Sequence, residues 1–462
     1  TLRSMAHGGI YDQVGGGFHR YTVDPAWLVP HFEKMLYDNA LLVPAYLEAF
    51  QATGDPELAA VVRDVLRYIG RDMTAPGGAF YSATDADSLD PQGEREEGWF
   101  FTWTPTELQA VLGPELAARV GAAWGVTAKG NFEGRNILNR PRPLADVATE
   151  LGVTEAALAA DVEQARDTLY RARKDRPAPL RDDKILVAWN GLMISAFARA
   201  AFVLDAPDLA ARGAAAADFL LAELRVDGTL RRAWLGAPSA YLGFFEDHAF
   251  FLQGLLDLFE ATGDVRWLQE ALALDAQIQA RFEDPAGGWF VTASDGEALL
   301  IRQKPSYDGA IPTGTSVQVL SLYRLLAMTG DDAYRVRAEA ALKASGTVLE
   351  QQPLALSELL LAVDFRTDRS LEVVIVSPPD APAGSLQALM APLRESFVPN
   401  RVLLPVVEGA QQEALAAITP LVAGKAARDG LPTAYVCEQG ACQWPTTDPS
   451  KLAEQIAAAS SY

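Results

Sequence analysis

The feature that most constrains this chain is a short turn that recurs between helical stretches. Residues 52–55, 261–264 and 328–331 share the pattern Thr-Gly-Asp after an apolar stretch and before a more mixed one. The glycine supplies the left-handed residue that ends one helix. The aspartate then caps the next helix by accepting its free amide hydrogens. A fourth copy at residues 204–208 places a proline near the new helix start. The pattern therefore predicts a repeated helix–turn–helix unit.

The second helix of each pair leads into a glycine-rich extended piece. Such pieces occur at residues 15–19, 77–81, 227–230 and 287–290. The repeating unit is thus a helix, a turn, a helix, a glycine turn and a short hairpin. Repetition on this scale is typical of a solenoid or a closed ring.

Two kinds of helix alternate in the repeat. Residues 185–204, 248–260 and 316–328 are apolar nearly all round, which predicts burial on every side. Their partners at 206–224 and 331–349 carry a polar face and are expected to lie outside. An inner ring of buried helices inside an outer ring is an (α/α) toroid. An open superhelix of the tetratricopeptide type would expose one face of every helix, so these apolar helices argue against it.

We predict that the toroid occupies residues 1–365. An insertion at about 84–180 interrupts it, with a β-hairpin formed by residues 81–87 and 96–103 because the run 99–103 is aromatic. Helices are expected there at 105–122 and 154–175. Residues 366–462 alternate strands and helices and are predicted to form a small α/β domain. Its strands are expected at 371–376, 401–407 and 433–437, and its helices at 384–395, 410–422 and 448–459.

Charge and composition exclude several classes of partner. The chain has 462 residues, is 49% hydrophobic and carries a formal net charge of −21. Such a charge repels nucleic acid and anionic membranes. No apolar run reaches the length of about 20 residues that spans a membrane. We therefore expect neither a nucleic acid nor a membrane as partner.

The termini and the cysteines suggest a compartment. The two cysteines, Cys437 and Cys442, are predicted to be a pair of inert thiols, since C-x4-C is neither a redox C-x-x-C motif nor a full zinc site. With no disulfide framework and no signal segment, we expect a cytoplasmic location. The chain begins at Thr1 with what reads as the end of a helix, so we expect it to be cut from a longer precursor.

Polar motifs occupy one register of the repeat. They lie at residues 30–39, 181–190, 246–248 and 306–309, each just before or at the first turn of an inner helix. The inner helices of a toroid run parallel, so their N-termini gather at one end. The four motifs are therefore predicted to meet in a single funnel and form a site there.

The predicted catalytic residues are His31, Asp38, Asp247 and His248. The spacing of His31, Lys34 and Asp38 predicts that they share one helical face. A histidine and a carboxylate one or two turns apart can act as a base and its orienting partner. The alternative is that the carboxylates only cap helices and that the imidazoles lie in the core.

The other polar and aromatic residues expected in this funnel, which we call the mouth, are predicted to bind the ligand. The acidic stretches at 84–87 and 94–97 are interpreted as solvated loops rather than as a hydrolytic carboxylate pair. Residues 85–90 lack the glycine and the terminal glutamate of a calcium loop, so neither a metal nor a cofactor is expected. Aromatic faces suit stacking against sugar rings. The predicted ligand-binding residues are His19, Arg20, Lys34, Asp183, Trp189, Asn190, Glu246, Tyr307 and Asp308.

Two motifs carry a resemblance to a known family. They are GGIYDQVGGGFHRY at residues 8–21 and HFEKMLYDN at 31–39, with support from 182–191, 246–249 and 435–445. Over essentially its whole length the chain resembles the thioredoxin-domain proteins typified by spermatogenesis-associated protein 20. The resemblance implies an N-terminal thioredoxin-like domain followed by an (α/α)6 domain of the six-hairpin glycosidase and N-acylglucosamine 2-epimerase type. The thioredoxin-like domain is absent from this chain and is its expected missing partner.

The function expected from these observations is that of a carbohydrate-active enzyme with a small sugar-like ligand. The resemblance implies histidines as proton-transfer groups, which His31 and His248 match by location. Lys34 or Arg20 would steady the enolate of an epimerase or isomerase. In a glycoside hydrolase, Asp38 and Asp247 would serve instead. The alternative is a non-catalytic scaffold that binds a sugar or a peptide beside the thioredoxin-like domain.

Overall fold

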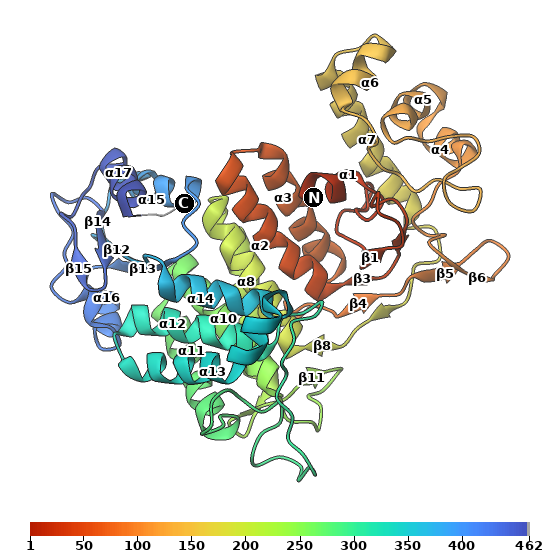
Figure 1. Ribbon diagram of the computed structural model, residues 1–462. Helices are drawn as coiled ribbons and strands as arrows, with labels where there is room; N and C mark the ends of the chain where they lie inside the picture. Colours follow the sequence, from red (N-terminus) through yellow and green to blue (C-terminus); the bar gives the residue numbers. More distant parts are fainter. Residues whose placement is uncertain (460–462) are drawn as a thin grey trace. The chain divides into compact units, whose positions relative to one another are not determined.

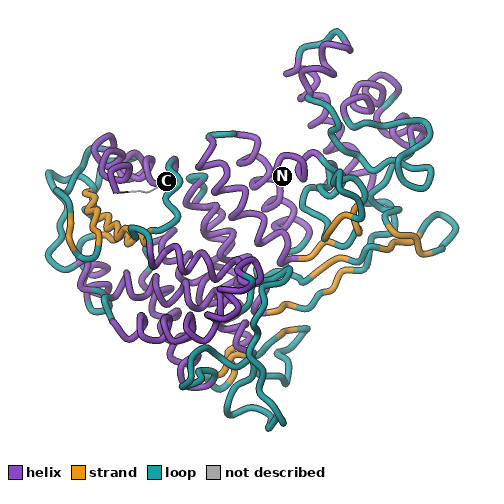
Figure 2. Tube along the Cα trace, viewed as in Figure 1, coloured by secondary structure: helices purple, strands orange, loops and turns teal. Residues whose placement is uncertain are grey.

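The computed structural model describes residues 1–459, and its elements are labelled in Figure 1. The chain divides into two compact units. The first contains Thr1–Leu42, Pro56–Thr74 and Tyr81–Asp183, and the second contains Val43–Asp55, Ala75–Phe80 and Lys184–Tyr462. Both units are mainly helical, and the longer strands lie in the C-terminal part of the second (Figure 2).

The first unit combines helices with very short strands. Helix α2 (Leu36–Thr53) belongs to it as far as Leu42. The other helices are α1 (Leu2–His7), α3 (Pro56–Asp72), α4 (Pro105–Leu112), α5 (Pro114–Ala123), α6 (Leu144–Leu151) and α7 (Glu155–Arg173). The strands are β1 (Tyr21–Thr22), β2 (Pro30–His31), β3 (Lys34–Met35), β4 (Ala83–Thr84), β5 (Asp87–Leu89), β6 (Arg95–Glu97) and β7 (Arg181–Asp182).

The predicted helical face of His31, Lys34 and Asp38 is wrong. His31 lies in β2 and Lys34 in β3, and the helix begins only at Leu36. Strand β3 pairs with β4, which in turn pairs with β7. This stretch is therefore held extended by strands that lie about 50 and 150 residues further along the chain. The spacing of neighbouring residues in the sequence cannot predict such long-range pairing.

The predicted strand at residues 99–103 is also wrong. The amides of Phe101 and Thr102 both donate to the Gly98 carbonyl, at 3.0 and 3.1 Å, which closes a turn. Gly98 has φ 74°, a left-handed conformation that glycine adopts without the steric penalty of a Cβ atom. The hairpin of the insertion is instead β5–β6, with Asp87 opposite Glu97. Trp103, just after the turn, is fully buried, whereas Trp99, Phe100 and Phe101 are half-buried.

The helices of the second unit pair as hairpins. The pairs are α8 (Val187–Val203) with α9 (Pro207–Phe219), α10 (Phe245–Thr262) with α11 (Val265–Arg281), and α12 (Gly314–Thr329) with α13 (Asp332–Gln351). A π-helical turn, η1 (Leu220–Leu224), extends α9, and η2 (Pro353–Leu356) precedes α14 (Ser357–Thr367). The short strands are β8 (Ile185–Leu186), β9 (Arg225–Val226), β10 (Thr229–Leu230) and β11 (Ala233–Trp234).

The first helix of each hairpin is buried and the second is amphipathic, as predicted. Nearly every residue of α8 is buried, whereas α13 buries only Arg337, Ala338 and Ala341. The inner helices run parallel. Asp247 near the start of α10 accepts the amide hydrogen of Ala188 near the start of α8 at 3.0 Å. Further along, Ser195 of α8 donates to Asp257 of α10 at 2.5 Å.

The predicted turns between the paired helices are confirmed. Gly263 and Gly330 are left-handed, with φ of 71° and 74°, and end α10 and α12. Asp264 and Asp331 then accept backbone amides at the start of the next helix. In the fourth copy Asp205 itself is left-handed, with φ 49°, so aspartate stands there in the place of glycine.

The C-terminal part contains a four-stranded mixed sheet in the order β13-β12-β14-β15. Strand β12 pairs parallel with β13 and antiparallel with β14. The strands are β12 (Leu371–Ser377), β13 (Arg401–Val407), β14 (Thr433–Glu438) and β15 (Ala441–Cys442). The helices are α15 (Ser385–Glu395), α16 (Ala410–Ala416), the 3-10 turn η3 (Pro420–Val422) and α17 (Pro449–Ala459). The predicted fold class, mainly α with (α/α) hairpins and a small C-terminal α/β domain, is confirmed.

Two further observations concern the chain as described. Cys437 and Cys442 face each other across β14 and β15 and form a disulfide. The prediction of two free thiols is therefore wrong, because the intervening turn at Gly440 brings the two sulfurs together. None of the helices within residues 1–459 is long and apolar enough to cross a membrane.

Candidate functional site

A cavity of about 200 Å³ lies where α8, α10 and α12 begin in the second unit. Three of the predicted ligand-binding residues line it: Trp189 in the first turn of α8, Glu246 in the first turn of α10, and Tyr307 in the loop before α12. Thr313, the N-cap of α12, completes the polar lining. The parallel inner helices thus bring these distant residues to one mouth within this unit.

An arginine that the sequence reasoning missed orients the acidic pair at this mouth. Nη1 of Arg232 lies 3.1 Å from Oε1 of Glu246 and 3.3 Å from Oδ2 of Asp247. Its guanidinium also stacks over the Phe244 ring, 4.3 Å from the ring centroid. The Glu246 side chain is 42% exposed. The cavity therefore has an accessible carboxylate beside a fixed positive charge.

Asp247 is buried and works as a helix clamp. Its carboxylate accepts the Phe244 amide at 2.7 Å, which caps α10, and the Ala188 amide at 3.0 Å, which ties on the start of α8. Burial raises its pKa to about 7, while Arg232 acts in the opposite direction. A carboxyl group with such a pKa can exchange a proton near neutral pH.

The fourth residue of an inner helix fastens the preceding glycine turn. In α8 this is Asn190, whose Oδ1 accepts the Phe80 amide at 2.8 Å and whose Nδ2 donates to the Phe80 carbonyl at 3.0 Å. In α2 it is Asn39, which makes the same two bonds to Phe18 at 2.8 and 3.1 Å. Each Nδ2 also donates to the carbonyl four residues earlier. Both asparagines are fully buried, so their geometry is that of a structural clamp.

His248 occupies the same position in α10. Its Nδ1 donates to the Phe244 carbonyl, four residues earlier, at 2.8 Å. The ring is fully buried against Phe282, with 4.9 Å between ring centroids, and its Nε2 has no hydrogen-bond partner among residues 1–459. Burial lowers its pKa to about 4, so the imidazole is neutral at pH 7. It does not line the mouth cavity, and its catalytic role stays a prediction.

Replacing Asn190 with alanine is expected to lower the free energy of unfolding by about 2 kcal/mol, because the N–H and C=O of Phe80 would remain buried without partners. Urea denaturation followed by circular dichroism measures the change. The matched control is Gln352→Ala, which removes an exposed amide side chain and should change stability by less than about 0.5 kcal/mol. Equal stability of Asn190→Ala and the native chain would contradict the clamp.

In the first unit, His31 lies between two carboxylates. Its Nδ1 is 2.6 Å from Oε1 of Glu97, and its Nε2 is 3.2 Å from Oε2 of Glu33. The ring stacks on Tyr21, with centroids 5.1 Å apart, and the side chain is 27% exposed. An accessible imidazole with two acidic partners has the geometry of an acid–base group.

Glu33 links His31 to two more of the predicted residues. Nη1 of Arg20 lies 3.0 Å from Oε2 of Glu33. Burial raises the pKa of Asp38 to about 7, with Arg20 lowering it and Glu33 raising it further. The first unit therefore holds one polar cluster of His31, Glu33, Arg20 and Asp38. A single cavity shared by His31 and His248 stays a prediction, since they belong to different units.

His19 and Lys34 lie inside the first unit. His19 Nδ1 donates to the Phe32 carbonyl at 2.9 Å, and burial lowers its pKa to about 3. Lys34 Nζ donates to Asp12 and to the Gly16 carbonyl, each at 2.8 Å. Burial lowers the Lys34 pKa to about 8, against the pull of Asp12. Both side chains are only 2% exposed. Their contact with a ligand stays a prediction.

The last two predicted residues stabilise loops. Asp183 is exposed and pairs with Arg181 at 2.6 Å. Asp308 accepts the Thr313 amide at 2.8 Å, the Ser316 hydroxyl at 2.9 Å and the Glu358 amide at 3.1 Å. It therefore fastens the loop carrying Tyr307 to the starts of α12 and α14. The sequence analysis did not predict the partners Glu33, Glu97 and Arg232. Their charge and their position near the motifs were the only features of the sequence that could have indicated them.

Comparisons with solved structures return sugar-processing proteins. D-mannose isomerase is 12% identical, with a TM-score of 0.35, and the match covers 75% of this chain and 85% of that one. Cellobiose 2-epimerase from Bacillus thermoamylovorans is 10% identical, with a TM-score of 0.34 and coverage of 75% and 86%. No family model matches the chain.

Comparison with curated proteins identifies clear relatives. Human spermatogenesis-associated protein 20 is 35% identical over 484 residues, which cover 98% of this chain and 61% of the relative. An uncharacterized protein of Caenorhabditis elegans is 30% identical, with coverage of 98% and 65%. The chain thus spans about three fifths of the length of the curated relatives. Over nearly its whole length the chain is therefore similar in sequence to spermatogenesis-associated protein 20.

Proposed function

We propose that the chain is a carbohydrate-active enzyme whose sugar-like ligand binds in the mouth cavity of the second unit. The observation that supports this most is the lining of that cavity by two aromatic side chains, Trp189 and Tyr307, beside the carboxylate of Glu246. Aromatic faces stack on the apolar face of a sugar ring. A small number of fixed polar groups then recognise its hydroxyls.

Glu246 is our candidate for the acid–base group, because its carboxylate lines the mouth cavity and is accessible to solvent. Its exposed carboxylate would remove the proton next to a sugar carbonyl, and Arg232 would stabilise the negative charge of the enolate oxygen. Return of a proton to C1 by Glu246 would complete an isomerisation, and addition of a solvent proton to the other face of C2 would complete an epimerisation. We therefore propose an epimerase or isomerase reaction. The histidine pair His31 and His248 is the alternative set of proton carriers. The acidic chain would act on its small ligand in the cytoplasm.

Incubation with mono- and disaccharides in deuterated water tests the proposal. An epimerase or isomerase exchanges the sugar C2 hydrogen for deuterium, which proton NMR follows, whereas a hydrolase releases a new reducing end. Glu246→Gln should lower turnover by about 100-fold or more, as loss of an acid–base group does. Glu297→Gln, an exposed acid of the following loop, is the matched control. Full turnover by Glu246→Gln would contradict the assignment.

His248→Asn separates the two sets of proton carriers. Asparagine is the residue at this position in α2 and α8, so the variant should fold and keep the bond to the Phe244 carbonyl. If Glu246 carries the chemistry, His248→Asn turns over normally. Loss of turnover with an unchanged melting temperature would assign the proton transfer to the histidine instead.

One observation favours the non-catalytic alternative. The Cys437–Cys442 disulfide lies on the edge hairpin, and Cys442 is exposed. A dithiol protein such as a thioredoxin-like domain could therefore reach its sulfur. A scaffold of this kind would bind sugars or peptides without turnover and would exchange its disulfide with the dithiol.

A further inference from the structure

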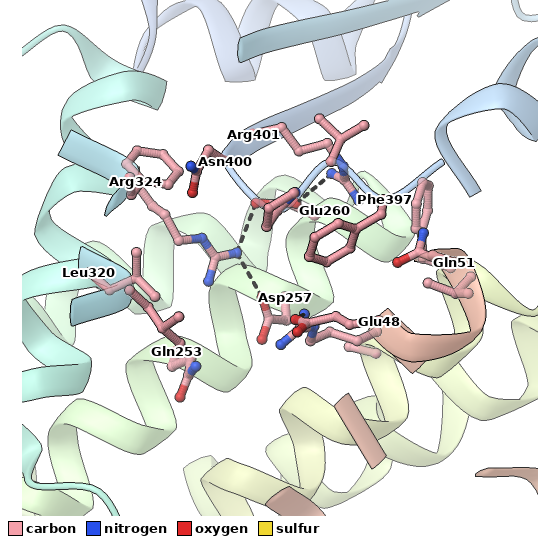
Figure 3. Close-up of a pocket in the computed structure, with 18 of the residues that line it drawn as sticks. Glu48, Gln51, Gln253, Asp257, Glu260, Leu320, Arg324, Phe397, Asn400 and Arg401 are labelled. Carbon is pink, nitrogen blue, oxygen red and sulfur yellow. Dashed lines mark hydrogen bonds and ion pairs between the residues drawn. The ribbon is translucent and has the colours of Figure 1, made fainter. Parts of the chain in front are cut away.

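A second cavity, of about 360 Å³, lies in the second unit, and Figure 3 shows residues that line it. Its walls are the later turns of inner helices α2, α8, α10 and α12, whereas the mouth lies at the starts of α8, α10 and α12. Helix α14 and the segment that leads into β13 complete it. No residue is shared with the mouth cavity, so the two are separate sites.

The arginines of this cavity are already paired. Arg324 reaches Asp257 at 2.7 Å and Glu260 at 2.8 Å (Figure 3). Arg401 reaches the other oxygen of Glu260 at 3.1 Å. Arg199 pairs with Glu48. Each guanidinium therefore has a carboxylate partner, and none is left to attract an anion.

The carboxylate of Glu358 forms no ion pair with these arginines. The side chain of Glu358, in the first turn of α14, makes neither a hydrogen bond nor an ion pair with any residue from 1 to 459. Its electrostatic neighbours are Asp308 in the loop before α12, Arg199 on α8 and Glu48 on α2. Arg199 already pairs with Glu48, and Arg324 and Arg401 pair with Asp257 and Glu260, so no arginine of the cavity forms an ion pair with Glu358.

The same cavity has a second acceptor in its lining. Oε1 of Gln253, on α10, is buried and has no hydrogen-bond partner within the described residues. Phe202, Phe365 and Phe397 supply aromatic surface around the same space. Two acceptors, a net negative charge and aromatic faces are complementary to a cation with several N–H donors.

We propose that this cavity binds a small organic ammonium ion, with its charged nitrogen at Glu358. A primary ammonium has three donors, which suit a carboxylate and an amide oxygen. The volume lies within the range of small-molecule pockets. The site is distinct from the sugar-like site proposed at the mouth and does not depend on it.

The proposal also predicts a dependence on pH. Burial raises the pKa of Glu358 to about 7, with Asp308 and Glu48 adding to the rise and Arg199 opposing it. Lowering the pH from 8 to 6 therefore protonates Glu358 and removes the charge that attracts the ammonium. Affinity should fall over this interval, whereas an amine held by unperturbed surface carboxylates would bind equally well at both values.

Isothermal titration of the 462-residue chain with 1,4-diaminobutane tests the site, with 1,4-butanediol as the uncharged analogue. Salt at about 0.15 M screens the general attraction of an acidic protein for cations. The diamine should bind and the diol should not. Glu358→Gln should weaken the diamine at least tenfold. Glu350→Gln removes the same charge from the exposed surface of α13 and should leave the affinity unchanged.

A third variant assigns the binding to one cavity. Glu246→Gln alters only the mouth, so diamine binding by this variant should equal that of the native chain. Loss of binding in Glu246→Gln, equal weakening in Glu350→Gln, or no binding to the native chain would each overturn the proposal. Thermal melting of each variant, followed by circular dichroism, checks that the fold is intact. Sugar turnover is measured separately and can fail without affecting this result.

Discussion

Asp12→Ala is expected to lower the free energy of unfolding by about 3–5 kcal/mol, the cost of leaving buried charges without their partner. Asp12 lies between two buried cations of the first unit. Its Oδ2 accepts from Nζ of Lys34 and from Nη2 of Arg173, each at 2.8 Å. Its Oδ1 accepts from the Val14 and Gly15 amides and from Nη1 of Arg173. Without the carboxylate, the two cations repel each other inside the protein.

The effect of Asp12 also has a predicted pH dependence. Burial alone would raise its pKa, but Arg173 and Lys34 hold it well below its usual range. Because the folded pKa is depressed, the carboxylate stabilises the fold at neutral pH. That stabilisation is lost as the pH falls below about 4, the usual value, and passes through the folded pKa.

Urea denaturation at pH 7 measures the effect. Asp12→Asn keeps the volume of the side chain but removes its charge and replaces one acceptor oxygen with an NH2 donor, so it should lose nearly as much stability as Asp12→Ala. Glu96→Ala, an exposed acid of β6, is the matched control and should change stability by less than about 0.5 kcal/mol. Near-native stability of Asp12→Asn would mean that the charge at this position is unimportant.

The repeat was predictable because its signals are local. In each turn a glycine ends one helix and the following aspartate caps the next. Both effects act within a few residues of Gly263 and Gly330. The C-terminal strands were predictable for the same reason, since β12 and β13 read as apolar runs. Such features depend little on the rest of the chain.

The errors and omissions concern contacts between distant residues. Lys34 lies in a strand because β4 and β7 pair there, and its Nζ turns to Asp12. The position of His248 in the repeat could have been found by aligning it with Asn39 and Asn190, which would have suggested a structural role. No motif in the sequence indicated Glu358, because the cavity around it is formed by residues of five helices that are distant in the sequence.

Gly191→Ala is expected to destabilise the chain by about 3 kcal/mol, the upper end of the range for overpacking a core. Gly191, in α8, faces the backbone of α10. A methyl group on Gly191 would lie 2.5 Å from the carbonyl carbon of Phe250 and 2.6 Å from the amide nitrogen of Phe251. Backbone atoms cannot rotate away as a side chain can, so the two inner helices would have to separate.

The same substitution at Gly346 should have the opposite sign. Gly346 lies inside α13, and no atom outside its own neighbourhood comes within 4 Å of an added methyl group. Alanine there should stabilise the chain by about 0.5–1 kcal/mol, because it restricts the unfolded state and favours the helix. Urea denaturation of both variants therefore separates helix propensity from helix contact.

The consequence of Gly191→Ala extends to the mouth. Trp189 and Asn190 precede Gly191 in the same helical turn, and Asn190 fastens the glycine turn at Phe80. Separation of α8 from α10 would move Trp189 away from Glu246 and weaken the binding of a sugar-like ligand, whereas Gly346→Ala should leave binding unchanged. If both variants gained stability, the close approach of α8 and α10 would be refuted. The mouth that depends on this approach would be refuted with it.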